Sequence, residues 1–129
     1  EEDWIKPVIL TAEETSRAQY LANRIATSPL TGDRLPDNHQ PEAEAIVLTK
    51  RSELDASRVL LEESAARQVS REEGVPITGF IGVLLLACEE HVLMPDEMRR
   101  LLNECRRQGT HYGSDLIDSV CSICERLGQ

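Results

Sequence analysis

Apolar residues recur at helical spacing along most of the chain, separated by short polar segments. In the segment 11–26 they fall three or four residues apart, and Thr11 followed by Glu14 is typical of a capping box at a helix start. The segment 41–51 opens with Pro41, which suits a first helical turn. The same spacing predicts further helices at 63–74, at 79–91, at 95–109 and from Ser114 onward.

Three short apolar runs have the composition of strands. Residues 58–61 (RVLL) are rich in β-forming side chains, as in the middle of a parallel sheet. Residues 75–78 form a similar run, and residues 4–10 look extended, with Pro7 limiting them to an edge or a break. Strands that alternate with helices predict the α/β class with a parallel sheet. Because these strands cover less apolar surface than the helices offer, the pattern indicates the larger part of a domain.

Glycine, proline and small polar residues mark where the predicted elements stop. The segment 27–41 is rich in Pro, Gly, Asp and Asn, so it is predicted to be a loop. Gly74 and Gly109 follow helical segments in the manner of C-caps, and Ser114 is a good N-cap for the last helix. The segment 79–91 is so apolar that its helix is predicted to be buried on most sides.

Composition narrows the class of protein. A chain of 129 residues is predicted to form one domain, 1–129, whose core is mainly aliphatic because aromatic residues make up only 3%. The net charge of −9 excludes a broadly basic surface for nucleic acid. The longest apolar run, 80–88, is shorter than the roughly 20 residues of a membrane span. No signal-peptide pattern is present, so we expect a cytoplasmic protein without membrane contact.

Four cysteines raise the question of a metal site. Cys121 and Cys124 form a C-x-x-C pattern, but it lies in a helical segment, and no second such pattern completes a familiar zinc site. Residues three apart share one face of a helix, so small buried thiols are the favoured interpretation. A metal site with His91 and His111 as extra ligands is the alternative.

Two carboxylates stand directly after the predicted strand at 58–61. Glu62 and Glu63 follow this apolar run and precede a helix-forming segment. Open α/β sheets bind ligands at the carboxyl ends of their strands, which favours a site at this edge. Acidic residues also stabilise a helix start through the helix dipole, so the pair by itself leaves both interpretations open.

Three segments, taken in order, resemble the PIN-domain family: PEAEAIVL (41–48), VLLEESAARQVSREEGVPITG (59–79) and GVLLLACEEHVLMPDEMRRLLNECRRQG (82–109). The chain is most similar to a bacterial and archaeal subgroup of PIN-like proteins related to toxin ribonucleases. That subgroup has an acidic-Ala-Glu-Ala-Ile helix start, a strand Leu-Leu-Ile-Asp with an Arg five residues later, and a Thr-Gly that opens an apolar helix. The matching positions here are Glu42 to Ile46, Leu60 to Glu62 with Arg67, and Thr78 with Gly79.

The resemblance implies a three-layer α/β fold in which helices flank a short parallel sheet. It also implies a site for Mg²⁺ or Mn²⁺ at the strand ends, because hard divalent cations prefer oxygen ligands. Glu42 and Glu62 are the implied catalytic metal ligands. Glu63 and Glu44 are weaker implied candidates for metal ligands. Thr78 is expected to orient a ligand or a water molecule.

The implied function is a metal-dependent endoribonuclease, in which bound metal activates water against a phosphodiester. The resemblance to toxin ribonucleases implies the toxin of a toxin–antitoxin pair. RNA is then the expected substrate, and an antitoxin protein and a second copy of the chain are the expected partners. Each proposed ligand also has a simpler interpretation, since Glu42 suits the dipole at a helix start and Arg67 suits a solvated surface position.

Two departures from the family pattern favour an alternative function for this chain. The family has Asp where this chain has Glu62, and the extra methylene displaces the carboxylate in a site of tight geometry. The family also starts with a strand that ends in Asp, and nothing before Trp4 provides it. We therefore expect an N-terminal part of about 40 to 50 residues to be missing from the sequence. The alternative function is a non-catalytic PIN-like interaction domain with a degenerate metal site.

Overall fold

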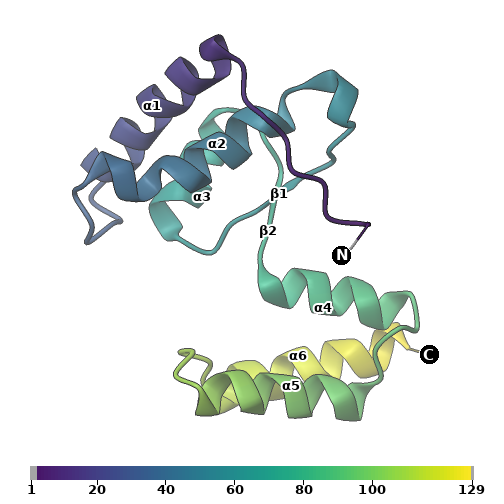
Figure 1. Cartoon of the computed structure of the whole chain (residues 1–129). Helices are drawn as coiled ribbons and strands as arrows, with labels where there is room; N and C mark the ends of the chain where they lie inside the picture. Colours follow the sequence, from purple (N-terminus) through teal and green to yellow (C-terminus); the bar gives the residue numbers. More distant parts are fainter. Residues whose placement is uncertain (1–2, 129) are drawn as a thin grey trace. The chain divides into compact units, whose positions relative to one another are not determined.

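Helices account for most of the structure, as Figure 1 shows. The computed structural model describes residues 3–128. The chain divides into two compact units, Glu1–Thr78 and Gly79–Gln129. The first unit contains α1 (Ala12–Thr27), η1 (Pro36–His39), α2 (Gln40–Thr49), η2 (Ser52–Leu54), β1 (Val59–Leu60), α3 (Ser64–Glu72) and β2 (Ile77–Thr78). The second unit contains α4 (Phe80–Glu89), α5 (Pro95–Arg107) and α6 (Ser114–Leu127).

The sheet of the first unit consists of β1 and β2, which run parallel and are connected through α3. Val59 pairs with Ile77 and Leu60 with Thr78. The ladder continues for one residue, because the backbone N–H of Leu61 donates to the carbonyl oxygen of Thr78 at 3.0 Å. The predicted parallel sheet, and with it the α/β class, is confirmed.

The predicted strand at 4–10 is wrong. These residues form a turn and irregular chain that joins no strand of the described part of the protein. The carbonyl oxygen of Ile9 instead accepts a hydrogen bond from the guanidinium of Arg51 at 2.9 Å. The backbone groups of a strand form hydrogen bonds with a neighbouring strand, whereas the Ile9 carbonyl oxygen forms its hydrogen bond with a side chain.

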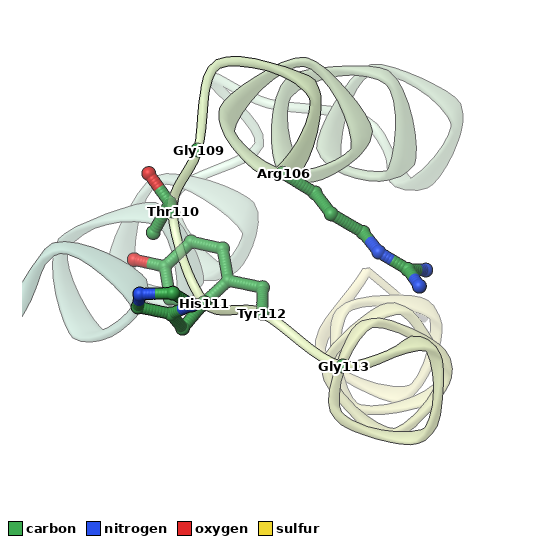
Figure 2. Close-up of a pocket in the computed structure, with 6 residues that line it drawn as sticks. All are labelled: Arg106, Gly109, Thr110, His111, Tyr112 and Gly113. Carbon is green, nitrogen blue, oxygen red and sulfur yellow. The ribbon is translucent and has the colours of Figure 1, made fainter.

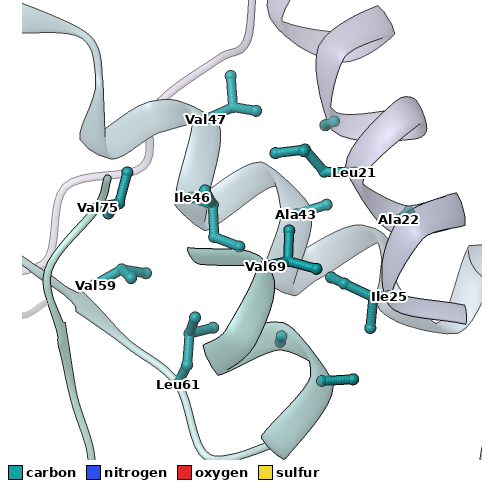
Figure 3. Close-up of a cluster of buried hydrophobic side chains, with 13 residues drawn as sticks. Leu21, Ala22, Ile25, Ala43, Ile46, Val47, Val59, Leu61, Val69 and Val75 are labelled. Carbon is teal, nitrogen blue, oxygen red and sulfur yellow. The ribbon is translucent and has the colours of Figure 1, made fainter. Parts of the chain in front are cut away.

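The core of the first unit lies between α1, α2, α3 and the sheet, as Figure 3 shows. Leu21 and Ile25 from α1 meet Ile46 from α2, and all three side chains are fully buried. The predicted capping box fixes the start of α1: the Glu14 N–H donates to Thr11 Oγ1 at 3.1 Å, and the Thr11 N–H donates to Glu14 Oε1 at 2.8 Å. Both local predictions for α1, its start and its apolar face, are therefore confirmed.

Ion pairs connect the three helices of this unit on their polar side. Glu73, at the end of α3, pairs with Arg17, with Arg24 at 3.7 Å and with Lys50 at 3.8 Å. Arg51, after α2, donates from Nε to Glu14 Oε2 at 2.9 Å and makes a second ion pair to the same carboxylate. The Arg51 contacts connect the N-terminal cap of α1 to the end of α2. Since every one of these ion pairs uses Glu14 or Glu73, the network depends on ionised carboxylates.

The Glu14 contacts make an acid-sensitive contribution to stability. Hydrogen bonds from Arg51 and from the Thr11 backbone lower the pKa of Glu14 from 4.5 to about 2. Because the folded-state pKa is depressed, this contribution is present above pH 4.5 and is lost as the pH falls toward 2.

We expect Glu14→Gln to lower the urea midpoint of unfolding at neutral pH. The same variant is expected to show a smaller decrease of that midpoint between pH 5 and pH 3 than the wild type. The exposed neighbour variant Glu13→Gln is the control, and an identical pH profile for wild type and Glu14→Gln would contradict the prediction.

The second unit is built from three helices around a small core. Met98 and Leu102 of α5 meet Ile117 and Val120 of α6, and these four side chains are buried. The prediction that the helix at 79–91 is buried on most sides is wrong. Cys88 is the one residue of α4 described as fully buried, whereas the exposed apolar residues of α4 are Phe80, Val83 and Leu86. Each helix of a three-helix unit has a limited face to bury, and α4 is apolar around more of its circumference than that face.

The cysteine prediction is partly wrong. Cys121 is a buried free thiol and Cys124 is buried, as the helix face predicted. Cys124, however, forms a disulfide with Cys88, which joins α6 to α4 across 36 positions of sequence. The pairing of cysteines does not follow from their spacing alone, so the sequence pattern did not reveal this bond.

Two glycines end helices as predicted. Gly74 and Gly109 have φ values of +72° and +106°, a region that side chains with a Cβ disfavour, and they follow α3 and α5. Ser114 was predicted to cap α6, but it is the first helical residue, and Gly113 occupies the cap position without a side-chain hydrogen bond. Among the helices of residues 3–128, none combines the length and apolar character of a membrane span.

Candidate functional site

A tight turn before α2 sets the position of Glu42. Asp33 accepts hydrogen bonds from the Leu35 N–H at 3.0 Å and from the Asn38 side chain at 2.9 Å. These bonds lower the pKa of Asp33, so its carboxylate stays ionised in the turn. His39 is buried, and its Nε2 lies 2.8 Å from the Asp33 carbonyl oxygen. The turn leads through η1 directly into α2, whose first turn contains the predicted ligand.

Glu42 is half-buried in that first turn, next to the fully buried Ala43. Its Oε2 atom is buried and has no hydrogen-bond partner among residues 3–128. The positive end of the α2 dipole favours a carboxylate at this place but does not satisfy a buried oxygen. A buried carboxylate oxygen without a donor is costly unless a cation or water meets it.

The sheet edge carries Glu62, Glu63 and Thr78. Since β1 and β2 are parallel, the residues after β1 and the end of β2 lie at the same edge, and the bond from Leu61 N–H to Thr78 confirms that placement. Glu62 is exposed there. Glu63 caps α3 through Oε2, which accepts from the Ala66 N–H at 2.6 Å. The helix-start interpretation therefore holds for Glu63, which leaves Glu62 as the carboxylate of the pair outside this cap.

One hydrophobic cluster supports both predicted ligands. Ala43 precedes the α2 residues that face the sheet, Leu61 immediately precedes Glu62, and both are buried in the same cluster. Figure 3 shows these two side chains in that cluster together with Ile46 and Val69. Glu42 and Glu62 are thus attached to backbone that borders a shared core. Glu44, the weaker candidate, accepts a hydrogen bond from the Gln40 amide at 3.3 Å.

Arg67 is a second residue with an unsatisfied buried atom. It lies in α3, five residues after Glu62, and its Nε is buried without a hydrogen-bond acceptor. The neighbouring Ala66 is fully buried in the cluster that also contains Ala43. Within residues 3–128, the buried side-chain atoms without a hydrogen-bond partner are Arg67 Nε and Glu42 Oε2. One belongs to a cationic side chain and the other to an anionic one.

Glu42 and Glu62 supply carboxylate oxygens, the type of ligand that a hard cation prefers, but they are only two residues. In the described part of the chain no three His, Cys, Asp or Glu side chains gather in a group that could hold a metal ion. Mg²⁺ often takes only one or two protein carboxylates and keeps several waters, so Glu42 and Glu62 have the right chemistry for it. The buried Glu42 oxygen without a partner is the observation that fits such an ion.

An open hollow in the second unit has a different character. It has a volume of about 490 Å³ and lies at the loop between α5 and α6. Figure 2 shows the Arg106 side chain extending on one side of this loop and the His111 and Tyr112 rings on the other. No carboxylate lines the hollow, so it lacks the ligands that Mg²⁺ or Mn²⁺ needs.

Comparison with known proteins identifies the family. The DUF3368 family model, described as a PIN domain, matches residues 10–126. No curated protein and no solved structure matches the chain. PIN domains are nuclease-type domains that generally depend on divalent metal ions. The match covers both structural units, and it agrees with the short parallel sheet and the helices around it. The chain belongs to the PIN-domain family.

Proposed function

We propose that this protein is an endoribonuclease that uses Mg²⁺ or Mn²⁺, with Glu42 and Glu62 as metal ligands. The buried Glu42 Oε2 without a partner carries the proposal, because a divalent cation at this place satisfies it. Glu62 supplies a second carboxylate at the carboxyl edge of the sheet, where α/β folds bind ligands. A divalent ion held by Glu42 and Glu62 would supply the activation of water for cleavage of a phosphodiester. Glu63 contributes less, since its Oε2 already caps α3.

The biological role within this proposal is that of a toxin in a toxin–antitoxin pair, acting in the cytoplasm. An antitoxin that covers the sheet edge and places an Arg side chain against the carboxylates would quench the site through charge-assisted hydrogen bonds. The whole of residues 1–129 acts as one PIN-like domain, and a homodimer is its assembly. Light scattering of the purified protein, with and without a candidate antitoxin encoded beside it, tests both partners.

The metal proposal predicts a large effect of Glu42→Gln. The amide removes the anionic oxygen with little change of shape, so we expect Mn²⁺ affinity to fall about tenfold or more, since even outer-shell changes at metal sites cost that much. Isothermal titration with Mn²⁺ measures the effect. Glu53→Gln, an exposed substitution in η2, is the matched control and is expected to retain the wild-type affinity.

RNA cleavage then separates the two functions. Loss of Mn²⁺-dependent cleavage in Glu42→Gln and Glu62→Gln, with Glu53→Gln unaffected, supports the enzyme. Equal Mn²⁺ affinity and equal RNA cleavage in wild type and all three variants would remove Glu42 and Glu62 from the mechanism. The second candidate, a non-catalytic interaction domain, is favoured by one observation, that the described residues gather no group of three metal ligands. It predicts no Mn²⁺-dependent cleavage by the wild type.

A further inference from the structure

Arg67 differs from four cations of its unit that have a carboxylate partner. Arg17, Arg24 and Lys50 share the carboxylate of Glu73, and Arg51 is bound by Glu14. Each of these four cations therefore has a carboxylate partner. Arg67, in the middle of α3, has a buried Nε atom for which the described residues provide no hydrogen-bond acceptor. Buried donors without acceptors are uncommon in native proteins and indicate a missing water, ion or ligand.

The surroundings of Arg67 and Glu42 overlap in the core. Ala66 immediately precedes Arg67, and Ala43 immediately follows Glu42. Both alanines are fully buried in one hydrophobic cluster. One buried atom of each side chain, Glu42 Oε2 and Arg67 Nε, has no hydrogen-bond partner among the described residues. A buried guanidinium N–H needs an acceptor, and a buried carboxylate oxygen needs a donor or a cation.

We propose that Arg67 binds a phosphodiester group of RNA next to the metal site at Glu42. The inference rests on the proposed function, and it adds to it the residue that holds the nucleic-acid backbone. A guanidinium presents donors in a planar fork that matches two oxygens of a phosphate, and the Nε–H is one of these donors. A metal ion on Glu42 and a phosphate on Arg67 together satisfy both buried atoms. In a chain of net charge −9, such a local cation favours the approach of RNA to the carboxylates.

The competing explanation is an ordered water molecule that accepts from Nε. A water satisfies the hydrogen bond equally well but makes no contribution to RNA affinity. The two explanations therefore differ in a measurable quantity, the dissociation constant for RNA in the absence of metal. Arg67→Met retains most of the apolar stem and removes the guanidinium, while Arg67→Lys keeps the charge and removes the planar fork.

The experiment measures binding of a fluorescently labelled single-stranded RNA of mixed sequence by anisotropy, in EDTA so that the RNA is not cleaved. We expect Arg67→Met to raise the dissociation constant about tenfold, the range of a charge-assisted hydrogen bond, and Arg67→Lys to fall between this variant and wild type. The matched control is Arg71→Met, an exposed cation one turn later on α3. It is expected to change affinity only by the small amount of one non-specific charge.

The outcomes are distinct. Wild-type affinity in folded Arg67→Met assigns the Nε to a structural water and overturns the proposal. An equal loss in Arg67→Met and Arg71→Met also overturns it, because general charge then accounts for the effect. If circular dichroism shows that Arg67→Met does not fold, Arg67→Lys decides, and wild-type affinity in that variant is contrary to the proposal. Titration of each variant with Mn²⁺ tests the metal site separately, so Arg67-dependent RNA binding without Mn²⁺ binding refutes the metal proposal alone.

Discussion

Removal of the Cys88–Cys124 bond is expected to lower the free energy of unfolding of the second unit by about 3 to 4 kcal/mol. The bond closes a loop of 36 positions, and loop-closure entropy of the unfolded chain gives a contribution of this size. Apart from this bond, α4 is held by partly buried side chains, Ile81, Leu84 and Leu85, and Cys88 is its one fully buried described residue. We expect Cys88→Ala, or treatment of wild type with a dithiol reductant, to lower the temperature at which the helical signal of this unit is lost.

Cysteines that are free in the structure provide the controls for this prediction. Cys105 is half-buried and unpaired, so Cys105→Ser is expected to retain the stability of wild type and its sensitivity to reductant. Thiol titration of the denatured, unreduced protein is expected to find the thiols of Cys105 and Cys121 alone. Four reactive thiols, or equal unfolding temperatures with and without reductant, would show that the bond does not form in solution.

The same bond gives a test of the expected cytoplasmic location. Disulfides are rare in reducing compartments, where thiols are kept reduced. A protein that works in the cytoplasm would therefore hold α4 without this covalent link, and the second unit would have the lower stability of the reduced chain. Alkylation of thiols before cell lysis, followed by mass measurement, reports which form the cell contains.

Local signals were sufficient where the deciding interaction spans only a few residues. The capping box of Thr11 and Glu14 closes on itself within one turn, and Gly74 ends α3 because the backbone there requires a positive φ. Both were predictable without knowledge of any distant part of the chain. The strand at 4–10 failed for the opposite reason, since its assignment depends on a partner strand, and Arg51 contacts Ile9 instead.

In the candidate site, too, the features set by local sequence were predictable and those set by packing were not. The sequence indicated that Glu62 and Glu63 follow a buried strand, and the parallel pairing of β1 with β2 places them at a sheet edge with Thr78. Which of the two carboxylates serves as a helix cap depends on the direction of each side chain, and spacing does not contain that information. The unsatisfied atoms of Glu42 and Arg67 likewise follow from packing of α2 and α3 against one cluster. The spacing of Arg67 from Glu62 matched the family pattern, but that pattern did not show that its Nε is buried without an acceptor.

Leu61→Ala is the second substitution for which we expect a large effect, a loss of about 2 to 5 kcal/mol in the free energy of unfolding. Leu61 is 4% exposed and lies in the cluster formed with α2 and α3. Truncation removes apolar contacts and leaves a cavity beneath the sheet edge, where the surrounding backbone is held by helices and relaxes only in part. Urea unfolding followed by circular dichroism measures the loss.

The adjacent Leu60 is the matched control, because neighbouring residues of a strand point to opposite faces. Leu60 is 57% exposed, so Leu60→Ala is expected to change the free energy of unfolding by no more than about 0.5 kcal/mol. Equal losses in the two variants would mean that the strand has a different register from the one described. The pair also tests the site, since Leu61 immediately precedes Glu62 and shares its cluster with Ala43 beside Glu42. If these carboxylates bind one ion, Leu61→Ala weakens Mn²⁺ binding under conditions where the variant is still folded, whereas Leu60→Ala leaves it unchanged.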